Sequence, residues 1–266
     1  MRLPDAIFRG KDRILDLGGW FIPELRATHV VDLLPWETRG AKVNLEPLPG
    51  ERFSKDTWLQ ADFLDPNFRL PFADKSFDLV LCGHTVEDLA APQNLLNEMQ
   101  RVGIQGVVEC PSRLIEQTIG VRDRMSRKPG HPHHHWIVES NEGELVLSSK
   151  PDSQLSSAAR LIPLTVSESL RNANPNADVV VHHWSASLRY RFAGPAECAS
   201  RAAQFVREKN PSGIDRLKDG ALRLARRTRA RLKGKAKEDF SWWEDIVERS
   251  RPYSMIPLPL PSSSGR

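Results

Sequence analysis

Cysteine is scarce in this chain, and the few cysteines lie far apart. Three occur among 266 residues, at Cys82, Cys110 and Cys198, and no two of them form a CxxC pair. An odd and dispersed set argues against a disulfide framework and against a cysteine-based metal site. It suits a reducing compartment, so we expect a cytoplasmic protein.

Long apolar runs are also missing. No stretch approaches the roughly 18–20 apolar residues of a membrane-spanning helix, and the mean hydropathy is −0.45. Residues 1–11 contain no apolar core of a secretory signal, so we expect none there. Hydrophobic residues nevertheless make up 39% of the chain, which is enough for a packed core and argues against wholesale disorder.

Positive charge is concentrated at one end. Residues 201–266 contain 16 Lys and Arg against 8 Asp and Glu, whereas residues 1–200 contain 22 against 26. A mildly acidic body therefore carries a basic extension. Such an asymmetry often marks a surface that meets an anionic partner.

The basic extension has a helical period between residues 215 and 237. A solvated helix face is the default interpretation. Peripheral contact with an anionic membrane surface is the alternative, since Leu217, Leu224 and the Trp242-Trp243 pair give the segment an apolar edge. No nucleic-acid-binding motif accompanies the charge, so we do not expect a nucleic-acid partner.

Five short apolar runs recur along the first 110 residues. They are rich in Val, Leu and Ile and nearly continuous in apolar character, as are strands of a parallel sheet buried on both faces. They span residues 13–17, 28–32, 57–60, 77–82 and 106–110. A helical pattern from Pro92 to Val102 separates the last two. Alternating strands and helices predict a Rossmann-like, doubly wound α/β sheet.

The pattern changes after residue 111. Runs at 136–139 and 144–148 flank a polar turn and predict a hairpin. Residues 150–177 predict a helix with loops, and residues 179–192 predict one long strand, so the mostly parallel sheet is expected to finish with antiparallel strands. We place one domain at residues 1–195 and a basic helical extension, frayed at its Pro/Ser-rich end, at residues 196–266.

Polar residues follow the carboxyl ends of the predicted parallel strands. Ligands of open α/β sheets bind at that edge, near the point where the strand order reverses. A glycine turn there lets a ligand approach the backbone. An acid at the end of the second strand is placed to accept hydrogen bonds from ribose hydroxyls. The residues at these ends are Asp16, Gly18, Gly19, Asp32, Asp62, Phe63, His84 and Glu109.

Residues 70–80, LPFADKSFDLV, resemble the LPFxDxSFDxV segment of class I S-adenosylmethionine-dependent methyltransferases of the type-11 group. Residues 84–89 resemble that group's HVLEH segment, and residues 92–102 resemble its helix ending in E-x-x-R-V. Residues 107–112 are similar to the IETPS segment of a bacterial subset, in which a His-Trp pair and a short hairpin follow. The resemblance implies that residues 1–195 are a methyltransferase-like domain with a Rossmann-like fold and S-adenosylmethionine as cofactor.

The resemblance also implies how the cofactor is held. The glycine turn after the first strand would meet the methionine end, the acid of the second strand would take the ribose hydroxyls, and the acid-aromatic pair after the third strand would take the adenine. In that order, the cofactor-binding residues would be Asp16 with Gly18 and Gly19, then Asp32, then Asp62 with Phe63.

The implied reaction is methyl transfer to an oxygen or nitrogen nucleophile. His84 would lie beside the reacting sulfur and is the first candidate for a general base, since the pKa of histidine is near neutral pH. Glu109 would belong to the same catalytic site, where an idle buried charge would be costly. The pathways in which the similar subset occurs suggest a small-molecule, glycan or lipid acceptor, such as a sugar, lipid or surface-polymer precursor.

Two features depart from the family pattern. Trp20 stands where the glycine loop normally has its last glycine, so an indole would reshape the cofactor site or cover it. Only 13 residues separate Gly18 from Asp32, with Pro23 between them, so we expect at most one or two turns near residues 23–26 instead of a full crossover helix. These features keep open the alternative of a catalytically inactive, methyltransferase-like binding or scaffold protein.

A histidine-rich segment, residues 131–135, invites a zinc interpretation with Glu139 as a fourth ligand. Adjacent histidines on one loop rarely face one point, and no cysteine completes the set. We therefore expect no metal site, and we interpret the segment as a loop bordering the active site, with His135 packed on the hairpin. A metal-dependent hydrolase is the corresponding minor alternative.

Overall fold

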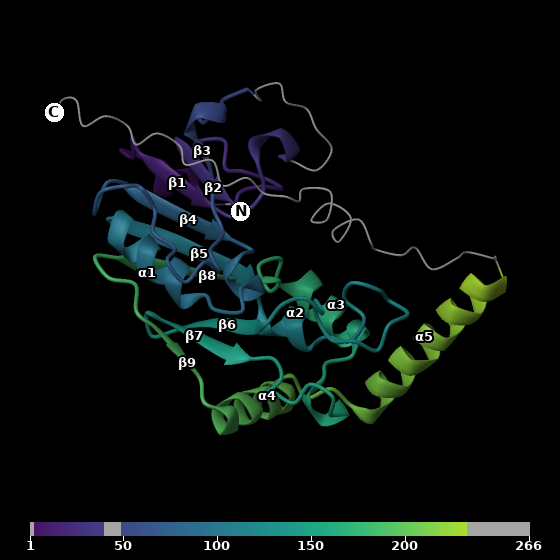
Figure 1. The fold of residues 1–266 in the computed structure, drawn as a ribbon. Coiled ribbons are helices and arrows are strands. Elements are labelled where there is room, and N and C mark those ends of the chain that lie inside the picture. Colours follow the sequence, from purple (N-terminus) through teal and green to yellow (C-terminus); the bar gives the residue numbers. More distant parts are fainter. Residues whose placement is uncertain (1–2, 40–48, 233–266) are drawn as a thin grey trace. The chain divides into compact units, whose positions relative to one another are not determined.

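The structure is a computed structural model that describes residues 3–39 and 49–232. These residues form two compact units (Figure 1). The first unit comprises residues 3–39, 49–109 and 183–188, and the second comprises residues 110–182 and 189–232. The Trp242-Trp243 pair and the Pro/Ser-rich end of the sequence lie outside the described residues.

A mostly parallel sheet dominates the first unit, with the strand order β3-β2-β1-β4-β5-β8 (Figure 1). The strands β1 and β4 are buried along nearly their whole length, as the continuous apolar runs predicted. This arrangement confirms the predicted α/β, Rossmann-like fold class. The strands are β1 (Ile14–Leu17), β2 (His29–Asp32), β3 (Trp58–Gln60), β4 (Leu79–Gly83), β5 (Gln105–Pro111) and β8 (Val179–Ser185).

The strand register brings the carboxyl ends of the parallel strands to one edge of the sheet. Leu17 at the end of β1 pairs with Val31 in β2 and with Cys82 in β4. Gly83 at the end of β4 pairs with Glu109 in β5. The strand order reverses between β1 and β4, which is the switch point where ligands of such sheets bind.

The connections of the first unit are uneven in length. Helix α1 (Gln93–Val102) begins and ends within one residue of its predicted bounds and buries its apolar face. The link between β1 and β2 contains a turn at residues 25–26 and no helix, in agreement with the prediction that it is too short for a full crossover helix. Short 3-10 helices occur at η1 (Asp5–Phe8), η2 (Trp36–Thr38), η3 (Lys55–Thr57) and η4 (Val86–Asp88).

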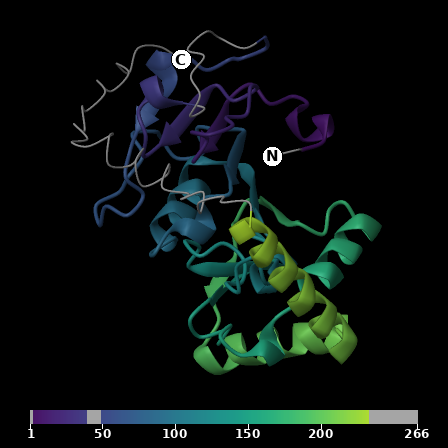
Figure 2. The same cartoon turned by 90° about the vertical axis from the view of Figure 1, so that its right-hand side faces the viewer.

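The second unit is built on the predicted hairpin. Strands β6 (Trp136–Asn141) and β7 (Glu144–Ser149) pair antiparallel, and β9 (Tyr190–Phe192) pairs parallel with β7. Figure 2 shows the two C-terminal helices, α4 in green and α5 in yellow-green. The helical elements of this unit are α2 (Arg113–Gln117), η5 (Ala158–Arg160), α3 (Leu164–Ala173), α4 (Pro195–Lys209) and α5 (Gly213–Leu232).

The predicted long strand at residues 179–192 is wrong. It breaks into β8 and β9, which belong to different sheets, and Ala186 between them has φ +63°, a left-handed backbone that ends a strand. β8 runs opposite to β5, because the Ala186 N–H donates to the Ile104 carbonyl whereas the Ser112 N–H donates to the Asp178 carbonyl. Among residues 3–39 and 49–232, no helix has both the length and the apolar character needed to cross a membrane.

Candidate functional site

A cavity of about 750 Å³ lies at the carboxyl ends of β1 and β4. Asp16, Gly18 and Gly19 line it from the end of β1, and Gly83 with His84 line it from the end of β4. Its volume falls within the range of about 300–1,000 Å³ that is usual for small-molecule pockets. The structure thus brings four of the predicted site residues together around one cavity.

Two glycines bring the backbone to the wall of this cavity. Gly18 has φ +80°, and a Cβ built there would lie 1.9 Å from the Thr85 hydroxyl oxygen. A Cβ at Gly19 would lie 2.6 Å from an Asp16 carboxylate oxygen. Both positions therefore require glycine, Gly18 for its left-handed backbone as well as for space.

Trp20 is buried beside the cavity and is not among the residues that line it. Its backbone N–H donates to Asp32 Oδ2 at 3.0 Å, and its indole N–H donates to the Thr38 carbonyl at 2.7 Å. The indole is thus anchored to the segment that follows β2. It does not fill the space next to the two glycines.

The acids at the ends of β1 and β2 both hold backbone N–H groups. Asp16 Oδ2 accepts from Glu24 at 2.8 Å, and Asp32 Oδ1 accepts from Leu34 at 2.9 Å. Burial raises the pKa of Asp16 to about 6 and the pKa of Asp32 to about 7. Asp32 does not line the cavity, so its contact with a ribose stays a prediction.

The acid-aromatic pair after β3 lies outside the cavity lining. Asp62 accepts the Leu64 N–H at 2.8 Å in a local turn. Phe63 is 4% exposed and meets Phe68 edge to face, with ring centroids 5.3 Å apart. The adenine role of Asp62 and Phe63 therefore also stays a prediction.

The segment between β1 and β2 supplies a wall of the cavity that the sequence did not predict. Residues 21–26 all line it. Glu24 in this segment forms an ion pair with Arg26 at 2.6 Å, and Arg26 also pairs with Asp5 at 2.7 Å. The shortness of the link between β1 and β2 could have indicated this wall, because a link too short for a helix runs along the edge of the sheet.

His84 lies between two buried carboxylates. Its Nε2 is 3.3 Å from Glu109 Oε1, and its Nδ1 is 3.5 Å from Glu87 Oε1. The hydrogen bond with Glu109, and then the one with Glu87, raises the pKa of His84 to about 9. The imidazole is therefore protonated at neutral pH, and His84 alone is not a base there.

Two structural facts complete this cluster. His84 has φ +53°, a left-handed backbone that is rare outside glycine, and its side chain is 49% exposed whereas those of Glu87 and Glu109 are buried. Glu87 was not among the predicted site residues. Its position could have indicated a role, because Glu87 follows His84 by three residues and a single helical turn brings such residues onto the same side.

Glu139, the fourth ligand of the zinc interpretation that we set aside, is held by Arg113 through two contacts of 2.8 and 2.5 Å. The histidine loop itself differs from its prediction in two ways. His135 is exposed and is not packed on the hairpin. The expectation that the histidines point apart is also wrong, because ligand atoms of His131, His133 and His134 all lie within 4.8 Å of one another.

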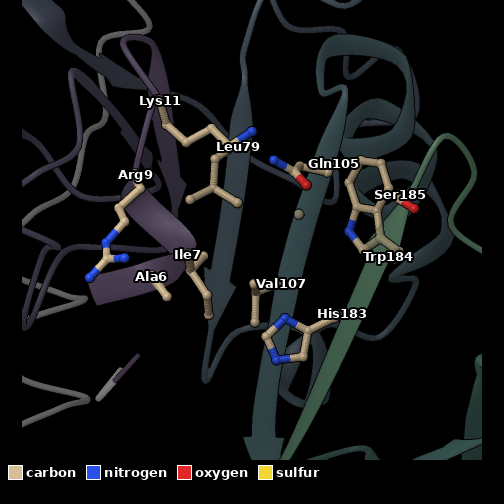
Figure 3. A pocket seen from close by; sticks show the side chains of 11 residues that line it. Ala6, Ile7, Arg9, Lys11, Leu79, Gln105, Val107, His183, Trp184 and Ser185 are labelled. Atoms are coloured by element: carbon tan, nitrogen blue, oxygen red, sulfur yellow. The ribbon is translucent and has the colours of Figure 1, made fainter. Parts of the chain in front are cut away.

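A second cavity, of about 510 Å³, lies at the opposite edge of the sheet (Figure 3). It opens at the amino ends of β4 and β5, since Leu79 and Gln105 are the first residues of these strands. Arg9, Lys11 and His183 give its lining a basic character. Ligands of open α/β sheets bind at the carboxyl edge, so we assign the candidate site to the first cavity.

Residues 31–108 match a family of proteins described as the methyltransferase domain. This stretch begins in β2 and ends in β5, and it contains Asp32, Asp62, Phe63 and His84. No curated protein matches the chain.

The chain is similar to several solved structures at low identity. For the YcgJ protein of Bacillus subtilis the identity is 18% and the TM-score 0.30, with 39% of this chain and 46% of that chain covered. For an S-adenosylmethionine-dependent methyltransferase of Aquifex aeolicus the identity is 15% and the TM-score 0.29, with 38% of this chain and 57% of that chain covered. For an S-adenosylmethionine-dependent methyltransferase of Mesorhizobium loti the identity is 16% and the TM-score 0.34, with 75% of this chain and 76% of that chain covered. The chain thus spans about half the length of the first two.

The family match and the cavity overlap in part. The match includes β4, whose end lines the cavity with Gly83 and His84, but it begins after β1, which lines the cavity with Asp16, Gly18 and Gly19. The strand order places the switch point at that cavity. Residues 31–108 of this chain thus match the methyltransferase domain, within a Rossmann-like sheet.

Proposed function

We propose that this protein transfers the methyl group of S-adenosylmethionine to an oxygen or nitrogen nucleophile. The observation that carries this proposal is the cavity lined by Asp16, Gly18, Gly19 and His84. It lies at the switch point of the sheet, where a cofactor of this class is expected. Trp20 is anchored away from it, which favours catalysis over the inactive scaffold alternative.

The lining suits the methionine end of the cofactor. That end carries an ammonium group, a carboxylate and a sulfonium. Asp16 and Glu24 offer carboxylates, and Arg26 offers a guanidinium. Bound S-adenosylmethionine supplies a methyl group on a positively charged sulfur, so the leaving group is already activated and the chain mainly contributes proximity and alignment.

An acceptor hydroxyl must lose a proton during the transfer. His84 together with Glu87 and Glu109 forms one imidazole and two carboxylates. His84 can take this proton in its neutral form, and the fraction of His84 in that form rises as the pH approaches its pKa of about 9. We therefore assign proton uptake to His84, whose half-exposed ring lines the cavity between the two carboxylates.

The test is a calorimetric titration of the purified chain with S-adenosylmethionine and with S-adenosylhomocysteine. Micromolar binding of either compound supports the proposal, and the search then moves to sugar, lipid and surface-polymer precursors as acceptors. No binding at millimolar concentration would overturn it in favour of the scaffold alternative.

We further propose that the enzyme works in the cytoplasm, peripheral to a membrane. Helix α5 supports this, because Ile214, Leu217 and Leu224 are 63%, 76% and 67% exposed on a helix rich in arginine. The chain should sediment with anionic vesicles and not with neutral ones. A Leu217→Ser, Leu224→Ser double variant keeps every charge and should lose most of this binding. Unchanged sedimentation of the double variant would contradict the proposed membrane contact.

A further inference from the structure

Three imidazoles of the loop that precedes β6 converge in the second unit. Ligand atoms of His131, His133 and His134 all lie within 4.8 Å of one another. The ring centroids of His133 and His134 are 4.5 Å apart, and those of His131 and His134 are 4.7 Å apart. Three nitrogen donors at this separation can surround a single ion.

A buried carboxylate orients the central imidazole. Glu116 Oε1 in α2 lies 2.7 Å from His134 Nδ1, and both side chains are buried. With Nδ1 at hydrogen-bond distance from this carboxylate, Nε2 is the nitrogen of His134 that would bind the ion. Metal-bound histidines usually donate their other ring N–H to such a carboxylate, which fixes the tautomer and the ring orientation.

The surrounding chain holds this arrangement in place. The Lys150 ammonium donates to Glu116 Oε2 and to the His131 carbonyl, each at 2.6 Å, which ties the loop to α2. Gly130 has φ +52°, and a Cβ there would lie 2.5 Å from Glu116 Oε2. Glycine at this position therefore lets the histidine loop approach the carboxylate closely.

We propose that His131, His133 and His134 form a Zn²⁺ site whose fourth position is open to solvent. Imidazole nitrogens suit zinc and related borderline ions, whereas calcium and magnesium prefer oxygen ligands. Zinc–nitrogen bonds of about 2.0–2.1 Å in tetrahedral geometry put the nitrogens about 3.3 Å apart. Binding would therefore require side-chain rotations that bring the donor atoms, now within 4.8 Å of one another, closer together.

The exposure of the three ligands explains the open position. His134 is buried and His131 half-buried, whereas His133 is exposed. One side of the site therefore faces water, as in zinc centres that keep one position for water or a substrate group. Arg122 Nη1 lies 3.1 Å from His133 Nδ1, and this exposed arginine swings aside if that nitrogen binds the ion.

The test uses the full chain without a polyhistidine tag, because a tag would bind zinc itself. After removal of metal with a chelator, Zn²⁺ is titrated against a chromophoric competitor, and Co²⁺ is added separately to record the visible spectrum of the site. We expect one Zn²⁺ per chain. We also expect tetrahedral Co²⁺ bands.

The variants separate a metal site from a structural cluster. His133→Ala and His131→Ala should each weaken zinc binding at least tenfold. Glu116→Gln should weaken it about 10–100-fold, because it removes the carboxylate that orients a metal-bound histidine. His135→Ala is the matched control, since His135 is exposed in the same loop and lies outside the cluster; it should bind zinc as the unaltered chain does.

Two results would overturn the proposal. One is the absence of stoichiometric zinc binding by the unaltered chain. The other is equal zinc affinity in the His133→Ala and His135→Ala variants. His133 is the decisive position because its exposed side chain can be replaced without disturbing the core. The result is independent of S-adenosylmethionine binding, so the proposed function stands or fails separately.

Discussion

The chain contains two histidine–glutamate pairs whose surroundings differ. In the first unit, His84 lies 3.3 Å from Glu109 and 3.5 Å from Glu87. In the second unit, His134 lies 2.7 Å from Glu116, but Glu116 also binds the Lys150 ammonium at 2.6 Å. One histidine thus lies between two carboxylates, whereas the other shares a single carboxylate with a lysine.

The surroundings of the imidazoles in the two units set their protonation at neutral pH. Two carboxylates raise the pKa of His84 to about 9, so this imidazole holds its proton. Burial, followed by the charge of neighbouring His134, lowers the pKa of His133 to about 4, so this imidazole stays neutral. A proton-holding histidine suits acid–base work, and neutral imidazoles are the form that binds metals.

Breaking the second pair should have the largest effect. Glu116→Ala leaves the nearly buried Lys150 ammonium without its carboxylate, and removal of one partner from a buried ion pair costs about 3–5 kcal/mol. We expect that loss in the free energy of unfolding, measured by urea denaturation. Glu168→Ala is the control, because Glu168 pairs with the exposed Arg124 and such pairs contribute about 1 kcal/mol or less. Equal losses would contradict the comparison.

The glycine wall of the first site should give the next largest effect. Gly18→Ala puts a Cβ 1.9 Å from the Thr85 oxygen at a left-handed backbone, so we expect a loss of about 2–3 kcal/mol in stability and loss of S-adenosylmethionine binding. Gly10→Ala is the matched control, since Gly10 has φ +67° with nothing within 4 Å, and it should lose about 1 kcal/mol and bind normally. Normal cofactor binding by Gly18→Ala would disprove its place in the cofactor site.

The His84 cluster can be tested through its titration. We expect NMR titration of His84 to give a pKa of about 9. Glu109→Gln should lower this pKa more than Glu87→Gln does, because the Glu109 hydrogen bond is the larger cause of the shift. Methyl transfer to a hydroxyl acceptor should rise with pH through this range and lose that rise in His84→Gln. A pKa near 6.5 in the unaltered chain would refute the two-carboxylate account.

The smallest expected effect is on the pH dependence of stability. Burial raises the pKa of Asp32 from 3.8 to about 7, so the folded chain binds more protons than the unfolded chain between these values. The stability from this group is complete below pH 3.8 and is lost as the pH rises through about 7. Asp32→Asn should flatten the fall of the melting temperature between pH 5 and pH 8 by several degrees. An unchanged slope would contradict the burial of this carboxylate.

Local patterns in the sequence were sufficient to predict most of the fold. The apolar runs of β1, β4 and β5, helix α1 and the β6–β7 hairpin all appear where their periodicity indicated. Asp16, Gly18, Gly19 and His84 meet around one cavity because parallel strands end at one edge. That step needed only the topology of the sheet, which the alternation of strands and helices already predicted.

The contacts that the sequence did not predict join side chains that lie far apart along the chain. Arg113 donates a hydrogen bond to Glu139, 26 residues away. Glu116 hydrogen-bonds His134, 18 residues away, in the histidine loop. No local period encodes such pairings. The break between β8 and β9 likewise depends on long-range pairing, because β8 joins the six-stranded sheet and β9 joins the three-stranded sheet. The continuous apolar pattern of residues 179–192 therefore could not predict the break.

The edge strand β8 has a consequence for how this chain can be divided. β8 comes from residues 179–185, yet it borders β5, and its Trp184 fills the space over Gly106, where a Cβ would lie 2.7 Å from the indole. A fragment ending at residue 109 would therefore carry all of the cofactor-edge glycines and still expose β5 as an unpaired, apolar strand. Such an edge promotes association between copies, so we expect the first unit to keep this edge covered only when the chain extends at least to residue 188.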